Sequence, residues 1–278
     1  MDELTAKVDR VTTLLHEADS VLVAFSGGAD SAFLLAAAVR ALGSDAVVAA
    51  TAVSASLPAA ERDSAATFAA SLGVRHEFPS TDEMSRPGYA ANAGDRCYFC
   101  KAELLDVLRP LARRLGMAHV ATGTNADDAR AGFRPGIRAA DERGALTPLL
   151  EAGLTKDEVR RVSRDWGLPT WDKPAAACLS SRIAFGVQVT PQRLARVERA
   201  ELALRAALAT AGVAVHDLRV RDLGDRARVE VDRDHVAVLS ARPELLESIE
   251  GFDVVDLDPR GFRSGSMNEL LADPDRFR

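Results

Sequence analysis

Short apolar runs alternate with helix-like segments through the first half of the chain, and this alternation restricts the possible folds more than any other feature. Four runs have the length and composition of buried strands, and they lie at 21–25, 46–53, 74–78 and 118–122. Three segments carry apolar residues at helical spacing, and these are 30–42, 58–73 and 101–116. Strands separated by helices predict a doubly wound α/β fold, in which a parallel sheet has helices on both faces.

A different pattern begins after residue 150, where two helix starts can be read from capping residues. Thr155 and Glu158 have the spacing of a capping box, and the helix that they open is expected to stop at Gly167. Thr190 and Pro191 supply an N-cap and a first-turn proline for a second helix. Both helices are therefore predicted from local chemistry as well as from periodicity.

The remaining segments of this half predict a small mixed domain. Three stretches are expected to form strands, and they lie at 216–224, 226–232 and 253–258. A helical stretch at 235–251 separates the last two of them. We therefore predict an α/β domain at 1–175 and a smaller α+β domain at 176–278 that contributes to the substrate site.

The size and charge of the chain restrict its partners. Its 278 residues are 47% hydrophobic, which is enough for a substantial buried core. The formal net charge of −6 argues against a nucleic-acid partner, because binding to a phosphate backbone normally uses a basic surface. No apolar run approaches the roughly 20 residues that span a bilayer, and the N-terminal segment lacks the pattern of a secretory signal. We expect a cytoplasmic protein that acts on a small molecule.

The segment after the first predicted strand reads SGGADS, from Ser26 to Ser31. Two glycines let the backbone approach an anion closely, and a helix N-terminus and two serine hydroxyls supply donors, so the loop is suited to bind phosphate. It matches neither the Walker loop nor the dinucleotide-binding motif. Two alternatives are a hydrolase nucleophile elbow with Ser26 as the nucleophile and a turn that serves packing alone.

This loop also resembles the SGGxDS signature of the PP-loop ATP pyrophosphatases, through Ser26, Gly27, Gly28, Asp30 and Ser31. In that family the loop binds the pyrophosphate that leaves ATP, and the loop aspartate, which is Asp30 here, is associated with Mg2+. The resemblance implies an adenine nucleotide alpha hydrolase-like form of the α/β fold.

Further strings narrow the resemblance to the LarE-type ATP-dependent sulfur transferases. Their order and spacing along nearly the whole chain are similar to those of this family. The strings are DRCYFCK, TGTNADD, FRPG, TPLLEAGLTKDEVR, KPAAACLSSRIAFG and GFRSGSMNE. The resemblance implies an enzyme in the biosynthesis of the nickel-pincer cofactor of lactate racemase. Such enzymes use ATP and Mg2+ to adenylate a carboxylate of a pyridinium-3,5-dicarboxylate mononucleotide and then replace AMP with sulfur, which gives a thiocarboxylate. Family members assemble from several subunits, so we expect a homo-oligomer.

Three cysteines are candidates for the sulfur chemistry, and they are Cys97, Cys100 and Cys178. In the cytoplasm a C-x-x-C pair is more often metal-binding or catalytic than a structural disulfide. The resemblance implies a four-iron four-sulfur cluster on these three thiolates, which passes on an external sulfide, and this is our preferred interpretation. The resemblance also allows a sacrificial route, in which Cys178 itself gives up its sulfur and the C-x-x-C pair is idle. Structural zinc, a disulfide and ordinary buried cysteines are further alternatives.

The loop after the fourth predicted strand is a second candidate for contact with ATP. By resemblance its residues Thr124, Asn125 and Asp127 bind the nucleotide, and the alternative is an Asx-type turn. Ligands of doubly wound sheets bind beyond the carboxyl ends of the strands, so this loop and the SGGADS loop are expected to face a common crevice.

The substrate residues are predicted in the second half of the chain. Ser181 and Arg182 follow Cys178 closely enough to hold a phosphate or carboxylate, and a guanidinium suits planar oxyanions. Arg219 and Arg221 alternate along one strand and so share a face. By resemblance they line the substrate site with Glu201, whereas the alternative is a solvated surface.

Three rival functions are compatible with a PP-loop. A tRNA thiolase would use the same ATP chemistry but should have a basic face, which the acidic balance of this chain disfavours. An ammonia-using synthetase would not need the cysteines. A non-enzymatic protein that binds ATP or a cluster would have no use for the acidic and arginine residues of a substrate site.

Overall fold

The computed structural model describes residues 2–130, 135–174, 177–263 and 265–271 and divides into two compact units. Within these residues, the first unit comprises 2–83 and 97–174, and the second comprises 84–96, 177–263 and 265–271. The predicted domain boundary at residues 175 and 176 lies outside the described residues and stays a prediction. No described helix is both long enough and apolar enough to cross a membrane.

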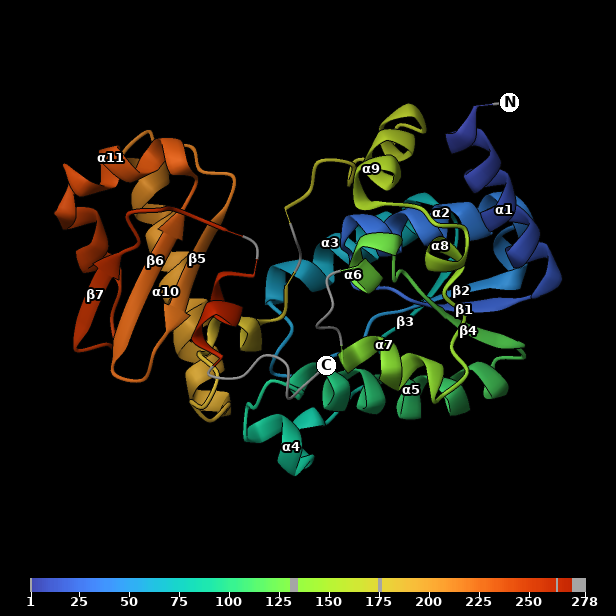
Figure 1. Ribbon diagram of the computed structural model, residues 1–278, viewed down its shortest axis with the longest axis horizontal. Coiled ribbons are helices and arrows are strands. Elements are labelled where there is room, and N and C mark those ends of the chain that lie inside the picture. Colours follow the sequence, from blue (N-terminus) through green and yellow to red (C-terminus); the bar gives the residue numbers. More distant parts are fainter. Residues whose placement is uncertain (1, 131–134, 175–176, 264, 272–278) are drawn as a thin grey trace. The chain divides into compact units, whose positions relative to one another are not determined.

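The first unit contains a four-stranded parallel sheet, as the alternating pattern predicts. Its strands are β1 (Val21–Ala24), β2 (Val47–Ala50), β3 (Arg75–Glu77) and β4 (His119–Thr122). They lie in the order β3-β2-β1-β4, and each neighbouring pair is parallel (Figure 1). Val21 of the central strand is in register with Val47 on one side and His119 on the other. The carboxyl ends of these strands therefore meet at one edge of the sheet.

Helices cover both faces of this sheet, because alternate strand residues are buried on opposite sides. Val21 and Val23 pack in one cluster with Phe33, whereas Leu22 packs in another with Leu105. The first face is covered by α1 (Glu3–Glu17), α2 (Ala29–Leu42), α3 (Ala59–Ser71), α8 (Pro148–Glu151) and α9 (Lys156–Asp165). The second is covered by α5 (Arg96–Arg114) and α7 (Pro135–Asp141) (Figure 1). The doubly wound α/β class predicted from the sequence is confirmed.

Helix α5 begins earlier than the sequence pattern predicts. We expected it to follow the cysteines, from Lys101, but it starts at Arg96 and includes both of them. Contacts with α7 and the residue after it explain the extra turn. Tyr98 Oη donates to Glu142 over 2.5 Å, and the guanidinium of Arg138 lies 4.6 Å from the Tyr98 ring centroid. Tertiary contacts thus extend the helix beyond its periodic segment.

The predicted helix starts and ends are confirmed where capping residues indicate them. Thr155 and Glu158 form the expected capping box of α9, and Gly167 follows its end with φ +70°. The Thr190 side chain caps α10 (Pro191–Thr210). Two short helices, η1 (Ser44–Ala46) and α6 (Ala126–Arg130), lie in the first unit. Two more lie between β3 and α5, and they are η2 (Glu83–Ser85) and α4 (Pro87–Ala90).

The second unit is built on a three-stranded sheet with α10 packed against it. Strand β6 (Arg226–Val231) lies between β5 (Leu218–Asp222), to which it is antiparallel, and β7 (Val254–Leu257), to which it is parallel. Leu204 and Leu208 of α10 share a buried core with Val220 and Val229. The remaining helical elements are short, and they are η3 (Leu179–Arg182), η4 (Arg233–His235), α11 (Val236–Ser240), η5 (Pro243–Ser248) and η6 (Ser266–Leu270).

Residues 84–96 belong to the second unit although in sequence they lie between strand β3 and the cysteines of α5, which belong to the first. Asn92 is fully buried, and its amide group donates to the carbonyls of Ala184 and Val187, each over 2.7 Å. Arg96 donates to the carbonyl of Ser180 over 2.9 Å. Buried polar groups need such partners, so these bonds fix the segment to the residues that follow Cys178.

Candidate functional site

The loop from Ser26 to Ser31 joins β1 to α2, and its shape depends on its own hydroxyls. Ser31 Oγ donates to the carbonyl of Gly28 and lies 3.1 Å from Ser26 Oγ. These partners are not bases, so they do not support Ser26 as a hydrolase nucleophile. Gly27 has φ +75°, a conformation that favours glycine. In this described loop no side chain caps α2, which leaves its first backbone N–H groups for an anion.

Gly123 brings the second predicted loop against the first. A Cβ atom at Gly123 would lie 2.8 Å from the backbone nitrogen of Ser31 and 3.0 Å from the carbonyl carbon of Asp30. Only a glycine allows the end of β4 to approach the first turn of α2 this closely. The two loops that the sequence analysis places at one sheet edge are therefore neighbours in the structure.

Asp30 lies in the first turn of α2 and offers a buried oxygen atom. Its Oδ1 has no hydrogen-bond partner among the described residues. Burial raises the pKa of Asp30; the positive charge of Lys156 opposes the rise, and the negative charge of Asp128 adds to it. Carboxylate oxygens are the ligands that Mg2+ prefers, so an unpartnered one near a second carboxylate fits the predicted magnesium association.

Replacing Asp30 by asparagine should stabilise the nucleotide-free protein at neutral pH. A carboxyl group with a raised folded-state pKa destabilises the fold once it ionises, so stability is lost as the pH rises from the ordinary pKa of 3.8 through the raised value. Asp30→Asn removes this loss, and its advantage should shrink as the pH falls toward 3.8. Urea unfolding over a pH series measures it, with the exposed Asp63→Asn as control. A less stable Asp30→Asn at neutral pH would contradict the burial of an ionised carboxylate.

The three predicted residues of the second loop have partners within the first unit. Asn125 Oδ1 accepts the backbone N–H groups of Asp127 and Asp128 over 3.0 and 3.1 Å, which is the Asx-type arrangement. The Asp127 carboxylate accepts the N–H of Lys156 over 2.8 Å at the start of α9. The hydroxyl of Thr124 meets that of the last β4 residue at 3.2 Å. These bonds shape the loop beside Asp30, and its contact with ATP stays a prediction.

Cys97 and Cys100 are three residues apart in the first two turns of α5, so both side chains project from one side of the helix. Cys97 is exposed, Cys100 is half-buried, and neither forms a disulfide. The structure thus does not support the disulfide or the buried-core interpretation for this pair. Burial lowers the pKa of Lys101, whereas negative charge on Cys100, Asp128 and Cys97 would raise it. A nearby ammonium favours thiolates, which are the form that binds metal.

Cys178 precedes η3 in the second unit and is held by the residues that follow it. Its half-buried Sγ lies 3.0 Å from Oγ of the fully buried Ser180. Its carbonyl accepts Ser181 Oγ over 2.7 Å and Arg182 Nη1 over 3.1 Å. Arg182 also forms a two-point ion pair with Glu201, over 2.9 and 3.1 Å. Three predicted substrate residues therefore belong to one network with Cys178.

Strand β5 places Arg219 and Arg221 together, as the alternation predicts, but in the interior of the second unit. Each is only 5% exposed, so the alternative of a solvated surface is wrong. Arg221 donates twice to Glu230 Oε2, over 2.6 and 3.0 Å. Ser266 Oγ donates to the other oxygen of Glu230 over 2.7 Å and completes this buried pair.

Burial and two neighbouring arginines disfavour the positive charge of Arg219. Its pKa is lowered to about 10 by burial and by the positive charges of Arg182 and Arg221, despite the opposing charges of Glu201 and Asp217. The charged form of a guanidinium is rarely disfavoured, and a bound anion would stabilise the positive charge and raise the pKa again. This part of the second unit is therefore suited to a carboxylate or a phosphate.

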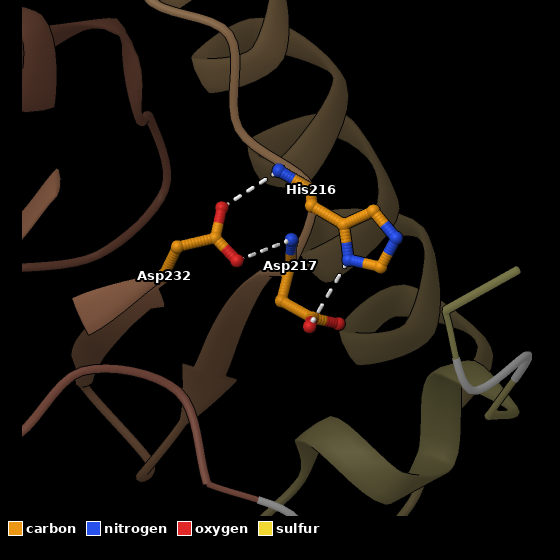
Figure 2. A group of neighbouring side chains, drawn as sticks. All are labelled: His216, Asp217 and Asp232. Atoms are coloured by element: carbon orange, nitrogen blue, oxygen red, sulfur yellow. Dashed lines mark hydrogen bonds and ion pairs between the residues drawn. The ribbon is translucent and has the colours of Figure 1, made fainter. Parts of the chain in front are cut away.

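The described residues also contain a group of three side chains whose ligand atoms lie close enough together for a metal ion, and Figure 2 shows them as His216, Asp217 and Asp232. The Asp232 carboxylate accepts the backbone N–H groups of His216 and Asp217 over 2.7 and 3.0 Å. His216 is exposed. These bonds cap the turn before β5, which explains the grouping without a metal.

Comparison with known proteins decides the family. No family model matches the chain. An uncharacterized protein of Synechocystis sp. is 42% identical over 274 residues, which are 97% of this chain and 99% of the relative. The pyridinium-3,5-bisthiocarboxylic acid mononucleotide synthase of Lactiplantibacillus plantarum is 34% identical over 275 residues, which are 98% of this chain and 97% of the relative. The chain belongs to the family of this synthase. An uncharacterized protein of Methanocaldococcus jannaschii is 26% identical over 175 residues, which are 62% of this chain.

Two residues beside these candidate site residues were not predicted from the sequence. Lys173 donates to the carbonyl of Gly27 over 3.1 Å, and Glu230 is the buried partner of Arg221. Lysine is rare here, at four of the 35 basic residues, and its rarity could have drawn attention to Lys173. Glu230 occupies an alternating position on the strand that pairs with β5. The FRPG string falls partly on residues 131–134, which lie outside the described residues, and Arg263 of GFRSG pairs with Glu269.

Proposed function

We propose that the chain is an ATP-dependent sulfur transferase that converts a carboxylate of a pyridinium-3,5-dicarboxylate mononucleotide to a thiocarboxylate. The observation that carries this proposal is the match along nearly the whole chain to a synthase whose name specifies the bisthiocarboxylic acid mononucleotide. Membership of that family makes the chain an enzyme that transfers sulfur, in nickel-pincer cofactor biosynthesis. In this proposal, the two groups of residues described above would supply what such a reaction needs.

ATP would bind with its outer phosphates at the SGGADS loop. The uncapped N–H groups of α2 and the two serine hydroxyls are donors for phosphate oxygens. Asp30 would hold Mg2+, which neutralises charge on the phosphates. A carboxylate oxygen of the substrate attacks the α-phosphorus, the bond to the pyrophosphate breaks, and an acyl-AMP and pyrophosphate are formed. This step makes a good leaving group from a carboxylate oxygen.

The arginine group of the second unit would bind the anionic substrate. Burial and the neighbouring arginines disfavour the positive charge of Arg219. Arg182 is held in place by its ion pair with Glu201, and Arg221 by its ion pair with Glu230. An anionic carboxylate or the nucleotide phosphate would bind between donors that are already oriented. Ser181 and Glu201, which belong to the Cys178 network, are part of the same proposed site.

The sulfur source is the second part of the proposal. Cys97, Cys100 and Cys178 would hold a four-iron four-sulfur cluster, which when bound supplies an open iron site for an external sulfide. None of the three thiols is paired in a disulfide, and ligation requires reduced thiols. In the alternative route, the Cys178 thiolate attacks the acyl carbon and displaces AMP. Loss of the Cα proton and cleavage of the Cβ–S bond then release the thiocarboxylate and leave dehydroalanine.

One experiment tests the reaction and separates the two sulfur sources. The anaerobically purified protein is incubated with MgATP, the dicarboxylate mononucleotide and sulfide, and the nucleotides, the product and the intact protein mass are measured. We expect AMP and pyrophosphate in equal amounts, thiocarboxylate, an unchanged protein mass, and cluster absorbance that disappears in Cys97→Ala. Loss of the mass of one hydrogen sulfide molecule from the protein would favour the sacrificial route instead. ADP as the product, or no ATP consumption, would contradict the proposed function.

A further inference from the structure

The ammonium group of Lys173 lies at the phosphate loop and is held there by two partners. Its Nζ donates to the carbonyl of Gly27 over 3.1 Å and to Glu61 Oε2 over 2.7 Å. A Cβ atom built on Gly27 would lie 3.6 Å from Glu61 Oε2 and 3.7 Å from Lys173 Nζ. The ion pair therefore lies directly beside the loop, on the side where a side chain at position 27 would project.

Hydrogen bonds hold the backbone of Lys173 in place, so its side chain extends from a fixed Cα position. The N–H of Lys173 donates to the carbonyl of Thr170 over 3.2 Å, and Arg160 of α9 donates to the carbonyl of Lys173 over 2.9 Å. Thr170 is itself buried. A lysine whose backbone is already fixed loses less conformational freedom on binding a ligand than one in a mobile segment.

The ion pair between Lys173 and Glu61 is within reach of water. The side chains of Lys173 and Glu61 are 21% and 25% exposed, and ion pairs that water reaches contribute little to stability. A lysine ammonium is a compact charge that binds phosphate well. A carboxylate next to a triphosphate, in contrast, repels it unless a cation intervenes.

We propose that Lys173 binds the pyrophosphate part of ATP and that Glu61 occupies its ammonium group until the nucleotide arrives. This inference depends on the proposed ATP-dependent function and adds one phosphate-binding residue to it. Lys173 turns from Glu61 to the phosphates while its backbone stays anchored. The exchange predicts opposite effects for the two residues: loss of the lysine weakens ATP binding, whereas loss of the glutamate charge strengthens it.

Calorimetric titration of the full-length protein with MgATP, pyrophosphate and AMP tests the exchange. Lys173→Met should weaken binding of MgATP and pyrophosphate about 10-fold or more and leave AMP binding within about 2-fold. Glu61→Gln should strengthen binding of MgATP and pyrophosphate several-fold. Lys7→Met is a matched control, because the Lys7–Glu158 pair has the same length of 2.7 Å and the same exposures of 21% and 25% but does not involve the loop. It should bind all three ligands as the unaltered protein does.

The opposite signs exclude a merely structural ion pair, since breaking such a pair from either side would have the same effect. Equal changes in both variants, or an unchanged ratio of ATP to AMP affinity in Lys173→Met, would overturn the inference. If Lys173→Met melts too early to be titrated, Glu61→Gln decides alone, because it keeps the lysine, and an unchanged pyrophosphate affinity overturns the exchange. Failure of the unaltered protein to bind MgATP would instead refute the proposed function.

Discussion

Replacing Arg221 by methionine is expected to lower the free energy of unfolding by about 3 to 5 kcal/mol. Arg221 and Glu230 form a buried ion pair, with side chains only 6% and 2% exposed. Without the guanidinium, the Glu230 carboxylate would remain in the interior with the hydroxyl of Ser266 as a neutral donor. Urea unfolding measures the loss, and an Arg221→Met variant that is as stable as the unaltered protein would contradict the pairing.

Arg219→Met is the matched control for this result, because both arginines lie on one face of β5 and both are 5% exposed. The pKa of Arg219 is lowered to about 10, so its positive charge is disfavoured in the folded protein without substrate. Arg219→Met should therefore stay within about 1 kcal/mol of the unaltered stability while it loses substrate affinity. The same substitution at two positions of one strand would thus distinguish an arginine that stabilises the fold from one that binds the substrate.

Gly123→Ala is expected to disturb the phosphate loop although it leaves every charge in place. The new Cβ atom would meet the backbone nitrogen of Ser31 at 2.8 Å, and backbone cannot rotate away as a side chain can. We expect a loss of about 1 to 3 kcal/mol in the free energy of unfolding. The start of α2 would have to move, so MgATP should bind about 10-fold more weakly or worse.

Gly136→Ala provides the control for this substitution. A Cβ atom at Gly136 would have its nearest contact at 3.5 Å, an ordinary distance, and Gly136 lies within α7. Alanine is a better helix former than glycine, so Gly136→Ala should be neutral or slightly stabilising. Thermal melting and MgATP titration of both variants measure the difference. If Gly123→Ala binds MgATP as tightly as Gly136→Ala, the close approach of the two loops is not needed for nucleotide binding.

The α/β architecture of the first unit could be predicted because its signals are local. Each predicted strand contains one of the four observed strands, and Thr155 and Thr190 cap helices where the sequence indicates. Parallel strands place the loops after β1 and β4 at one edge of the sheet, and the approach of Gly123 to Ser31 agrees with this.

The features that were missed depend on contacts between distant parts of the chain. The early start of α5 involves contacts of Tyr98 with Glu142, and the assignment of residues 84–96 to the second unit depends on Asn92. Lys173 reaches a loop 146 residues away. Arg219 and Arg221 were expected on one face of a strand, but their burial could not be predicted. Charged side chains are almost never fully buried unless they are paired, and the sequence does not reveal the partners.

The transfer of oxygen from substrate to AMP tests the central chemical claim most directly. The dicarboxylate mononucleotide is labelled with 18O in its carboxylates and incubated with the protein, MgATP and the sulfur source, and the AMP is analysed by mass spectrometry. Adenylation of the carboxylate followed by replacement of AMP with sulfur predicts one 18O atom in each AMP formed. Unlabelled AMP accompanied by thiocarboxylate would contradict the claim, because the carboxylate oxygen would then have left by another route.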